Sequence, residues 1–379
     1  MPTTPLSPLA RIPDDLRTLA DYERRAEAHM EPAAWRHLQE GAGAGQTIAH
    51  NRIAFDGMRL VPRVLADLGG ATTRVDLFGL SHAAPILLAP LAYHRIAHPQ
   101  GEVATITGAT ALDTSMVVST LSSVAMEELA SAAQGAAAEL GRTPPPLWFQ
   151  LYCQPDRSHT LELVRRAESA GYRILVVTVD AAIKRSEFAL PPGVDAANLR
   201  GMPRPRQHAS AAGGKILFGT PFMDGVPTWD TLAWLRSVTT LPIVVKGVLA
   251  PEDAKRTMDI GMDGLIVSNH GGRVMDGLVH PLEVLPAVLA AVDDRGPVLL
   301  DSGVRTGVDV LRALALGARA VLIGRPQIHA LAVAGMAGVA HMLHILRVEL
   351  EMAMAQTGCA SVGTISPQLL AGPASLREA

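Results

Sequence analysis

Cysteine and aromatic residues are scarce in this chain, which has 2 cysteines in 379 residues and only 4% Phe, Trp and Tyr. Cys153 and Cys359 lie far apart, so they match neither a zinc-ligand spacing nor a disulfide framework, although two cysteines suffice for one bridge. Such sparse use is typical of a reducing compartment. With few aromatic rings, the core must be built mainly from Ala, Leu and Val, and 48% hydrophobic residues are enough for a large one.

Neither charge is in excess, since 33 Lys and Arg face 36 Asp and Glu and the formal net charge is −3. Without a basic block, nucleic acid is not an expected partner. We find no run of about 18 uncharged apolar residues. Residues 1–25 lack the apolar core of a signal peptide. We therefore expect a cytoplasmic protein that does not span a membrane.

From residue 85 onward, apolar segments of strand length recur, and most intervals between them have helical periodicity. Eight such segments predict a (β/α)8 TIM barrel of parallel strands, in one domain spanning residues 1–379. The alternative, an open doubly wound sheet, needs a glycine-rich fingerprint after its first strand, and Ala89-Pro90-Leu91-Ala92 is not one. The predicted strands are residues 85–91, 116–121, 147–152, 173–180, 242–248, 264–270, 297–303 and 320–326.

Several segments lie outside this repeat. Residues 12–60 are expected to form helices, and residues 75–78 one arm of a short hairpin. The interval of about 187–228 is long, rich in Pro and Gly, and follows the fourth strand, so we interpret it as a lid loop over the barrel mouth. Residues 328–357 are expected to be helical and to pack on the barrel or on a neighbouring subunit.

Residues 264–277 contain the most informative motif, an apolar strand that ends in Ser268-Asn269-His270-Gly271-Gly272-Arg273. The glycines allow a sharp turn close to a ligand. A histidine can take a proton near neutral pH, and an arginine can hold a carboxylate by two parallel hydrogen bonds. For a lone histidine, an ordinary polar turn is the simpler interpretation. The other strand ends change that balance.

Polar or charged side chains stand at nearly every predicted strand end, and in a barrel these ends share one face. Burying them unpaired would cost roughly 1–3 kcal/mol each, so a polar ligand is expected there. In chain order the strand-end residues are Ala89, Pro90 and Ala92, then Ser122, Gln150, Tyr152, Thr178, Asp180, Lys246, Ser268, His270, Asp301, Gly303, Arg305, Gly324 and Arg325.

The last two strand ends indicate a phosphate site. Backbone amides around Gly303 and Gly324, with Arg305 or Arg325 close by, resemble the site that barrels often form after strands seven and eight. Lys246 has two interpretations, a Schiff-base amine or a cation that holds negative charge on a cofactor ring. A Schiff-base aldolase is therefore a competing hypothesis, but it gives no role to the His-Gly-Gly-Arg segment one strand away.

Taken in order, these motifs resemble the FMN-dependent L-2-hydroxy acid oxidases and dehydrogenases, the family of glycolate oxidase, lactate oxidase and mandelate dehydrogenase. The likeness runs from about residue 15 to residue 366. The segment Ala92-Tyr93-His94-Arg95 is most similar to the hydroxymandelate oxidase branch. The segments that carry the likeness are Ser268-Asn269-His270-Gly271-Gly272-Arg273, Leu241-Pro242-Ile243-Val244-Val245-Lys246-Gly247-Val248, Asp301-Ser302-Gly303-Val304-Arg305 and Ile323-Gly324-Arg325-Pro326. Supporting segments are Ala97-His98-Pro99-Gln100-Gly101-Glu102, Phe149-Gln150-Leu151-Tyr152 and Thr178-Val179-Asp180.

The resemblance implies FMN as the cofactor and a role for each catalytic candidate. His270 would take the substrate proton, and Asp180 would orient it. Arg273 would hold the carboxylate, Tyr152 would hydrogen-bond near the reacting oxygen, and Lys246 would lie at the N1–O2 edge of the flavin. The implied FMN-binding residues are Ala89, Pro90, Ala92, Ser122, Gln150, Thr178, Lys246, Ser268, Asp301, Gly303, Arg305, Gly324 and Arg325.

Three candidate substrate-binding positions depart from the family pattern. His37 stands where the family has a carboxylate-binding tyrosine, and a neutral histidine binds a carboxylate less firmly than a charged donor. Arg185 follows the fourth strand without the usual Gly-x-Arg turn, and Val124 replaces a pocket aromatic. Together these departures favour a bulkier or aromatic, mandelate-like substrate over glycolate or lactate.

We therefore predict an FMN-dependent 2-hydroxy acid oxidase, without a metal, that uses dioxygen and releases hydrogen peroxide. No haem-binding segment precedes the barrel and no membrane anchor is visible, which favours dioxygen over a cytochrome or membrane acceptor. The alternatives are an FMN barrel with another reaction, such as a dehydrogenase with a different acceptor, and a flavin-binding barrel that has lost activity. The likeness also implies a homo-oligomer, a tetramer or larger.

Overall fold

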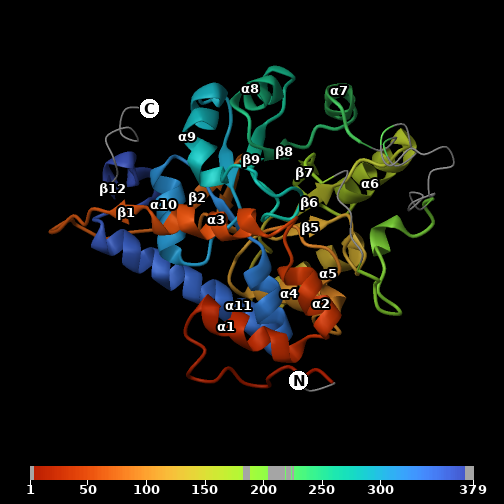
Figure 1. The fold of residues 1–379 in the computed structure, drawn as a ribbon, viewed down its shortest axis with the longest axis horizontal. Helices are drawn as coiled ribbons and strands as arrows, with labels where there is room; N and C mark the ends of the chain where they lie inside the picture. Colours follow the sequence, from red (N-terminus) through yellow and green to blue (C-terminus); the bar gives the residue numbers. More distant parts are fainter. Residues whose placement is uncertain (1–3, 182–187, 204–217, 219–222, 224–225, 372–379) are drawn as a thin grey trace.

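The computed structural model describes residues 4–181, 188–203, 218, 223 and 226–371, and its centre is a barrel of eight parallel strands (Figure 1). These are β4 (Ile86–Leu88), β5 (Val117–Ser119), β6 (Trp148–Leu151), β7 (Ile174–Thr178), β8 (Ile243–Val248), β9 (Gly264–Val267), β10 (Val298–Leu300) and β11 (Val321–Ile323). A parallel bridge between Leu88 and Met116 joins the start of β5 to β4 and nearly closes the ring. The eight predicted strands are confirmed, and the open doubly wound sheet is wrong.

One helix follows each barrel strand, as a (β/α)8 repeat requires. They are α4 (Glu102–Ala111), α5 (Met126–Glu139), α6 (Arg157–Ser169), α7 (Trp229–Val238), α8 (Pro251–Asp259), α9 (Pro281–Val292), α10 (Gly307–Ala315) and α11 (Arg325–Gln356). Local capping explains several of their starts. Thr306 caps α10 by accepting a hydrogen bond from the Asp309 amide, and Thr228 caps α7 in the same way through Thr231.

A hairpin seals the amino end of the barrel. It consists of β2 (Val75–Leu77) and β3 (Leu80–His82), which confirms the hairpin predicted at residues 75–78. The Phe78 ring at its turn packs edge-on against Trp148, with ring centroids 5.6 Å apart, and joins the apolar interior of the barrel. Because this end is filled, the carboxyl ends of the strands are where a ligand can enter.

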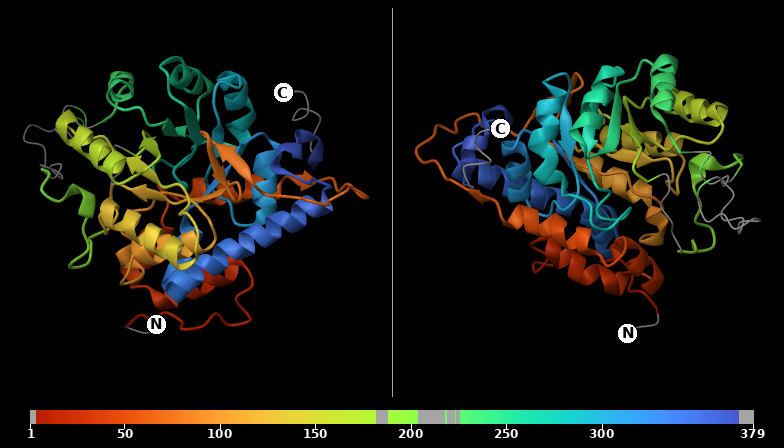
Figure 2. Two further views of the ribbon diagram at one scale, coloured as in Figure 1. Left: turned by 180° about the vertical axis from the view of Figure 1, so that it is seen from behind. Right: turned by 45° about the horizontal axis from the view of Figure 1, so that its top comes forward.

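The predicted N-terminal helices are confirmed as α1 (Leu19–Ala26), α2 (Pro32–Gln39) and α3 (Gln46–Asp56), with a 3-10 turn η1 (Glu27–His29). α1 packs against α11 (Figures 1 and 2), and the Tyr22 hydroxyl lies 2.9 Å from His341 Nδ1. The remaining short elements are β1 (Arg59–Leu60), η2 (His94–Ile96), η3 (Ala197–Leu199), η5 (Val362–Thr364), η6 (Pro367–Leu369) and β12 (Leu370–Ala371).

The long C-terminal helix corrects one expectation. By length and composition α11 is apolar enough to cross a membrane, although the sequence was expected to hold no such segment. Its histidines and glutamine interrupt the apolar pattern without adding charge. The helix packs against α4, α1 and α10, and 61% of its most apolar window is buried. This burial is typical of a core helix, and it confirms the expected helix over residues 328–357.

Two buried histidines make the stability of the fold depend on pH. His82 and His280 are 4% and 2% exposed. His82 Nδ1 lies 3.0 Å from Ser115 Oγ, and His280 Nδ1 accepts from the Leu282 amide at the start of α9. Burial lowers the pKa of both imidazoles from 6.5 to about 4. Both rings are therefore neutral in the folded protein near neutral pH.

We expect the free energy of unfolding to fall as pH drops from 6.5 toward 4, because the unfolded chain binds protons that the folded chain does not. Each histidine contributes roughly 3 kcal/mol to this loss. Urea denaturation at several pH values measures it. His82→Gln should flatten the pH dependence, whereas His344→Gln, at an exposed position of α11, should leave it unchanged. A pH-independent unfolding free energy over this range would contradict the expectation.

Candidate active site

A histidine–carboxylate pair lies at the carboxyl end of the barrel. His270 follows β9 and Asp180 follows β7, and His270 Nδ1 is 2.9 Å from Asp180 Oδ1. His270 has a left-handed backbone (φ 57°), an uncommon conformation for a residue with a side chain, and its amide donates to Ser268 Oγ at 3.0 Å. Burial opposes ionisation of Asp180, but the neighbouring His270 and Lys246 hold its pKa below the usual value. The pair therefore has the form of a general base with an orienting carboxylate.

Gly247 makes room for this carboxylate. It lies in β8 at a shift of the strand register, and its φ of 106° lies in the region that favours glycine. A Cβ atom built there would lie 2.5 Å from Asp180 Cγ. The approach of Asp180 to His270 therefore depends on a missing side chain in the next strand.

We expect Gly247→Ala to displace Asp180 and to lower the catalytic rate by about 10²-fold, the usual cost of a 1 Å misplacement. Gly261→Ala is the matched control, because Gly261 also has positive φ (81°) but nothing lies within 4 Å of its built Cβ. Both variants carry backbone strain of about 1–2 kcal/mol. Only Gly247→Ala should change turnover and its pH profile. Equal losses of turnover in the two variants would show that strain alone is responsible.

Lys246 forms a buried ion pair in the same layer of the barrel. Its Nζ lies 3.1 Å from Asp301 Oδ2 and donates to Ser268 Oγ at 2.8 Å. Burial alone would favour the neutral amine, but Asp301 and Asp180 raise its pKa above the usual value. A Schiff-base lysine must instead lose its proton to attack a carbonyl. The geometry thus favours the interpretation of Lys246 as a fixed cation and opposes the aldolase hypothesis.

Arg273 and Tyr152 lie near the pair formed by His270 and Asp180. Arg273 Nη1 donates to the carbonyls of Leu38 (2.8 Å) and Glu40 (3.0 Å) at the end of α2. Burial raises the pKa of the Tyr152 phenol, Asp180 raises it further, and Arg273 opposes the rise. Tyr152 is therefore within electrostatic range of both the carboxylate of the pair and the guanidinium. The structure brings these predicted catalytic residues together.

The predicted phosphate site is a cluster of half-buried guanidinium groups. Burial lowers the pKa of Arg325 to about 9, and repulsion from Arg273 and Arg305 adds to the effect. Burial also lowers the pKa of Arg305, whose Nε lies 3.9 Å from the carboxylate of Glu23. Such crowded cations gain most from an anion. The donor chemistry therefore fits a phosphate group.

Asp309 shapes the loop that carries these groups. Its side chain is fully buried, and Oδ2 accepts from the Arg305 amide at 2.9 Å and from Arg52 Nη1 at 2.7 Å. Arg52 Nη1 also donates to the carbonyl of Gly303, which has a φ of 95°. No motif in the sequence pointed to Asp309 or Arg52 as supports of the phosphate loop.

Buried polar atoms at the strand ends test the fit of a flavin ring. Gln150 Nε2 and Thr178 Oγ1 are buried and have no hydrogen-bond partner within the described residues. Unpaired buried donors and acceptors are costly, so a polar ligand is expected beside them. Together with the cations at Lys246, Arg305 and Arg325, they fit a polar ring that carries a phosphate. Over the described ranges, no group of three His, Cys, Asp or Glu side chains is arranged for a metal.

Several predicted contacts are already occupied by the protein itself. Ser122 Oγ donates to the carbonyl of Val124 and accepts from Asn198 Nδ2. The carbonyl of Ala89 accepts from Gln327 Nε2 at 2.9 Å. These residues shape the carboxyl end of the barrel, and their contacts with FMN stay predictions.

The remaining predicted residues fall in different environments. Pro90 and Ala92 are half-buried after β4, Gly324 precedes α11, and Val124 is only 2% exposed within the core. Arg185 lies outside the described residues. His37, on α2, stacks on Phe188 with ring centroids 4.4 Å apart and planes 13° apart.

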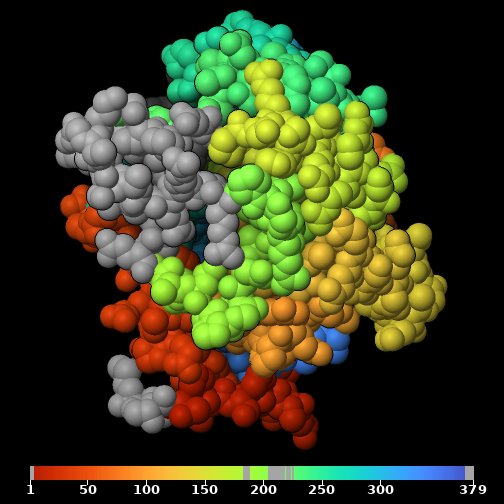
Figure 3. Space-filling model, turned by 90° about the vertical axis from the view of Figure 1, so that its right-hand side faces the viewer, coloured from red at the N-terminus to blue at the C-terminus, as the bar shows by residue number. Residues whose placement is uncertain are grey.

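Part of the predicted lid is described and is docked on the barrel. The fully buried Asn198 in η3 accepts from the Met126 amide and donates to the carbonyls of Ser119 and Thr120. Figure 3 shows residues 188–203 in bright green on the surface beside α6. Sequence reasoning missed Asn198, because a single polar residue in a long loop carries no motif. The rest of the segment up to residue 225 lies largely outside the described residues.

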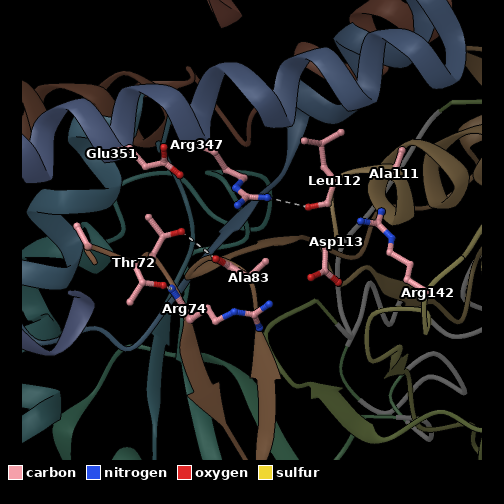
Figure 4. Close-up of a pocket in the computed structure, with 11 residues that line it drawn as sticks. Thr72, Arg74, Ala83, Ala111, Leu112, Asp113, Arg142, Arg347 and Glu351 are labelled. Atoms are coloured by element: carbon pink, nitrogen blue, oxygen red, sulfur yellow. Dashed lines mark hydrogen bonds between the residues drawn. The ribbon is translucent and has the colours of Figure 1, made fainter. Parts of the chain in front are cut away.

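A separate cavity of about 400 Å³ lies away from these strand ends, near the sealed end of the barrel (Figure 4). It is lined by Arg74, Arg142 and Arg347 together with Asp113 and Glu351. Arg347 Nη1 donates to the carbonyl of Leu112, and Arg142 donates to the carbonyl of Thr110. These arginines bind the last carbonyls of α4 and favour its negative end. Two of the three arginines that line the cavity are therefore engaged in helix capping.

The chain is similar over nearly its whole length to known proteins. The family model of FMN-dependent dehydrogenases matches residues 26–372. The chain is 46% identical over 372 residues to an L-lactate oxidase of Alicycliphilus denitrificans (96% of this chain, 99% of that protein). It is 41% identical over 354 residues to a 4-hydroxymandelate oxidase of Amycolatopsis orientalis (91% and 96%). A crystal structure of mandelate oxidase with (S)-2-phenylpropionate superposes with a TM-score of 0.82 at 39% identity (94% and 98%).

Proposed function

Because the chain belongs to the FMN-dependent dehydrogenase family, we propose that it oxidises a 2-hydroxy acid to a 2-oxo acid and reduces dioxygen to hydrogen peroxide. FMN is the cofactor of the family. The observation that carries the proposal is the pair formed by His270 Nδ1 and Asp180 Oδ1, 2.9 Å apart at the carboxyl face. The chain's similarity to oxidases supports dioxygen as the acceptor.

FMN, when bound, supplies the two-electron redox chemistry. The side chains supply the rest. Arg273 binds the substrate carboxylate, and Tyr152 hydrogen-bonds the reacting oxygen. His270 takes a proton through Nε2, the ring nitrogen that faces away from Asp180. Asp180 holds the ring through Nδ1 and stabilises the imidazolium.

Two further sets of cations complete this assignment. Lys246 stays protonated beside Asp301 and would supply positive charge at the edge of the bound flavin ring. Arg305 and Arg325, with the backbone near Gly303 and Gly324, hold the phosphate. We place Ala89, Gln150 and Thr178 along the ring, since the buried polar atoms of Gln150 and Thr178 favour a polar partner.

An anaerobic panel of glycolate, L-lactate and both mandelate enantiomers, followed by flavin absorbance, tests the proposal. The purified protein should be yellow, and at least one acid should bleach it. Fast reoxidation by dioxygen in stopped flow supports an oxidase, and very slow reoxidation supports a dehydrogenase with another acceptor. Failure of every acid to reduce bound FMN would support a barrel that has lost catalysis. A protein that binds no FMN overturns the proposal.

We also propose a cytoplasmic homo-oligomer, a tetramer or larger. The apolar side chains of Val64 and Leu65 support it, because they are 82% and 100% exposed in the segment after β1. Light scattering after size exclusion should give a mass of at least four chains, and Leu65→Asp should lower it. A monomer would contradict this part, and cell fractionation tests the location.

A further inference from the structure

We propose that Phe188 and His37 form an aromatic wall of the acid pocket that selects 2-hydroxy acids with a planar aromatic side chain. This inference rests on the proposed function and names the substrate class of the same site. It starts from the stack itself, whose rings lie 4.4 Å apart and nearly parallel. Phe188 precedes the docked loop segment around Asn198, and His37 lies in the last turn of α2.

Hydrogen bonds join the backbone next to His37 to Arg273, the predicted carboxylate-binding arginine. Leu38, next to His37, accepts from Arg273 Nη1 at 2.8 Å and from Arg325 Nε at 3.0 Å. The backbone carbonyl of Glu40 accepts from Arg273 Nη1 at 3.0 Å. Both arginines thus hold the carboxyl end of α2, the helix that carries His37, beside the predicted carboxylate site.

Aromatic residues are concentrated around this site, although the chain holds only 6 Phe, 4 Tyr and 4 Trp. Tyr152 comes from the end of β6 and is within electrostatic range of Arg273 and of the Tyr93 phenol. Tyr93 follows β4 with a left-handed backbone (φ 57°), an uncommon conformation for a tyrosine. The stack of Phe188 and His37 lies on the side of Arg273 formed by α2. In this aromatic-poor chain, the turn after β4, the end of β6, α2 and the loop before η3 therefore each contribute a ring to this region.

The chemistry of stacked rings explains the selection. Offset-stacked and edge-to-face aromatic pairs attract one another beyond the effect of buried area. His37 is one ring of the stack, so its imidazole is oriented by Phe188, unlike a tyrosine whose hydroxyl points at a carboxylate. The α2 side of the pocket thereby provides ring surface for the substrate side chain, and the carboxylate relies on Arg273 and Tyr152.

The test compares kcat/KM for (S)-mandelate and L-lactate in the FMN-loaded enzyme. Phe188→Leu keeps an apolar side chain but removes the ring, and should lower the mandelate-to-lactate ratio roughly five- to tenfold. Phe188→Tyr keeps the ring and should preserve the ratio. Phe218→Leu is the control, because that ring is 80% exposed. Titration of bound FMN with benzoylformate and with pyruvate should show the same loss of preference without turnover.

His37→Leu, alone and with Phe188→Leu, tests whether the rings act as a pair. The mandelate-to-lactate ratio of kcat/KM should fall in each single variant. In the double variant, the fold decrease of this ratio should be smaller than the product of the two single decreases. An unchanged ratio in Phe188→Leu, or multiplicative effects, would overturn the inference. If the wild-type enzyme oxidises mandelate but the substitutions at Phe188 and His37 leave the mandelate-to-lactate ratio unchanged, only this inference fails. If no 2-hydroxy acid reduces wild-type FMN, the proposed function itself fails.

Discussion

Replacing His270 with Gln is expected to slow reduction of bound FMN by about 10²- to 10⁴-fold, the range for loss of a general base. Gln is close to His in size and can still donate to Asp180, but it cannot accept the substrate proton near neutral pH. The phosphate cluster around Arg305 and Arg325 is untouched, so FMN should stay bound. Anaerobic stopped flow with saturating substrate measures the rate, and absorbance measures the flavin content.

His344→Gln is the matched control for this change, because His344 is exposed on α11. Bound FMN in this variant should be reduced by substrate at the wild-type rate. Near-normal reduction in His270→Gln would remove His270 as the base, and loss of FMN from the variant would show instead that the residue supports the cofactor site. Residue 270 has a left-handed backbone, so a substitution there can also affect the fold. An unchanged melting temperature of the FMN-free variant would assign any loss of FMN to the cofactor site.

The barrel could be predicted from the sequence because each strand is a local signal. The run of β7 is apolar from Ile174 to Val177, as expected for a strand buried on both faces, and a helix follows it. Once the strands are parallel, their carboxyl ends must share one face. This is why Asp180 and His270, 90 residues apart in sequence, could be assigned to one site before any contact was known.

Other parts of the site could not be predicted because their role exists only in three dimensions. Asn51 and Asn269 exchange two side-chain hydrogen bonds of 3.0 and 2.7 Å between α3 and the turn after β9. Gly247 matters because a side chain from another strand occupies the space where its Cβ would lie. His37 was noticed only as a departure from a family pattern, and its stacking on Phe188 depends on a loop whose path no local pattern specifies.

Replacing Lys246 with Met is expected to have the second large effect, and it acts on both stability and rate. Asp301 is 6% exposed and would lose its cation. Removing one partner of a buried ion pair costs about 3–5 kcal/mol. Lys255→Met, which breaks an exposed pair with Asp259, should cost no more than about 1 kcal/mol. Urea denaturation of the two variants compares these costs.

A double variant separates the two roles of Lys246. Lys246→Met with Asp301→Asn removes the unpaired carboxylate, so most of the lost unfolding free energy should return. Flavin reduction should nevertheless stay about 10²- to 10³-fold slow, because no charge remains to stabilise the negative ring that forms on reduction. If the double variant recovered both stability and rate, Lys246 would serve only to neutralise Asp301. Recovery of stability alone identifies its charge as part of the chemistry.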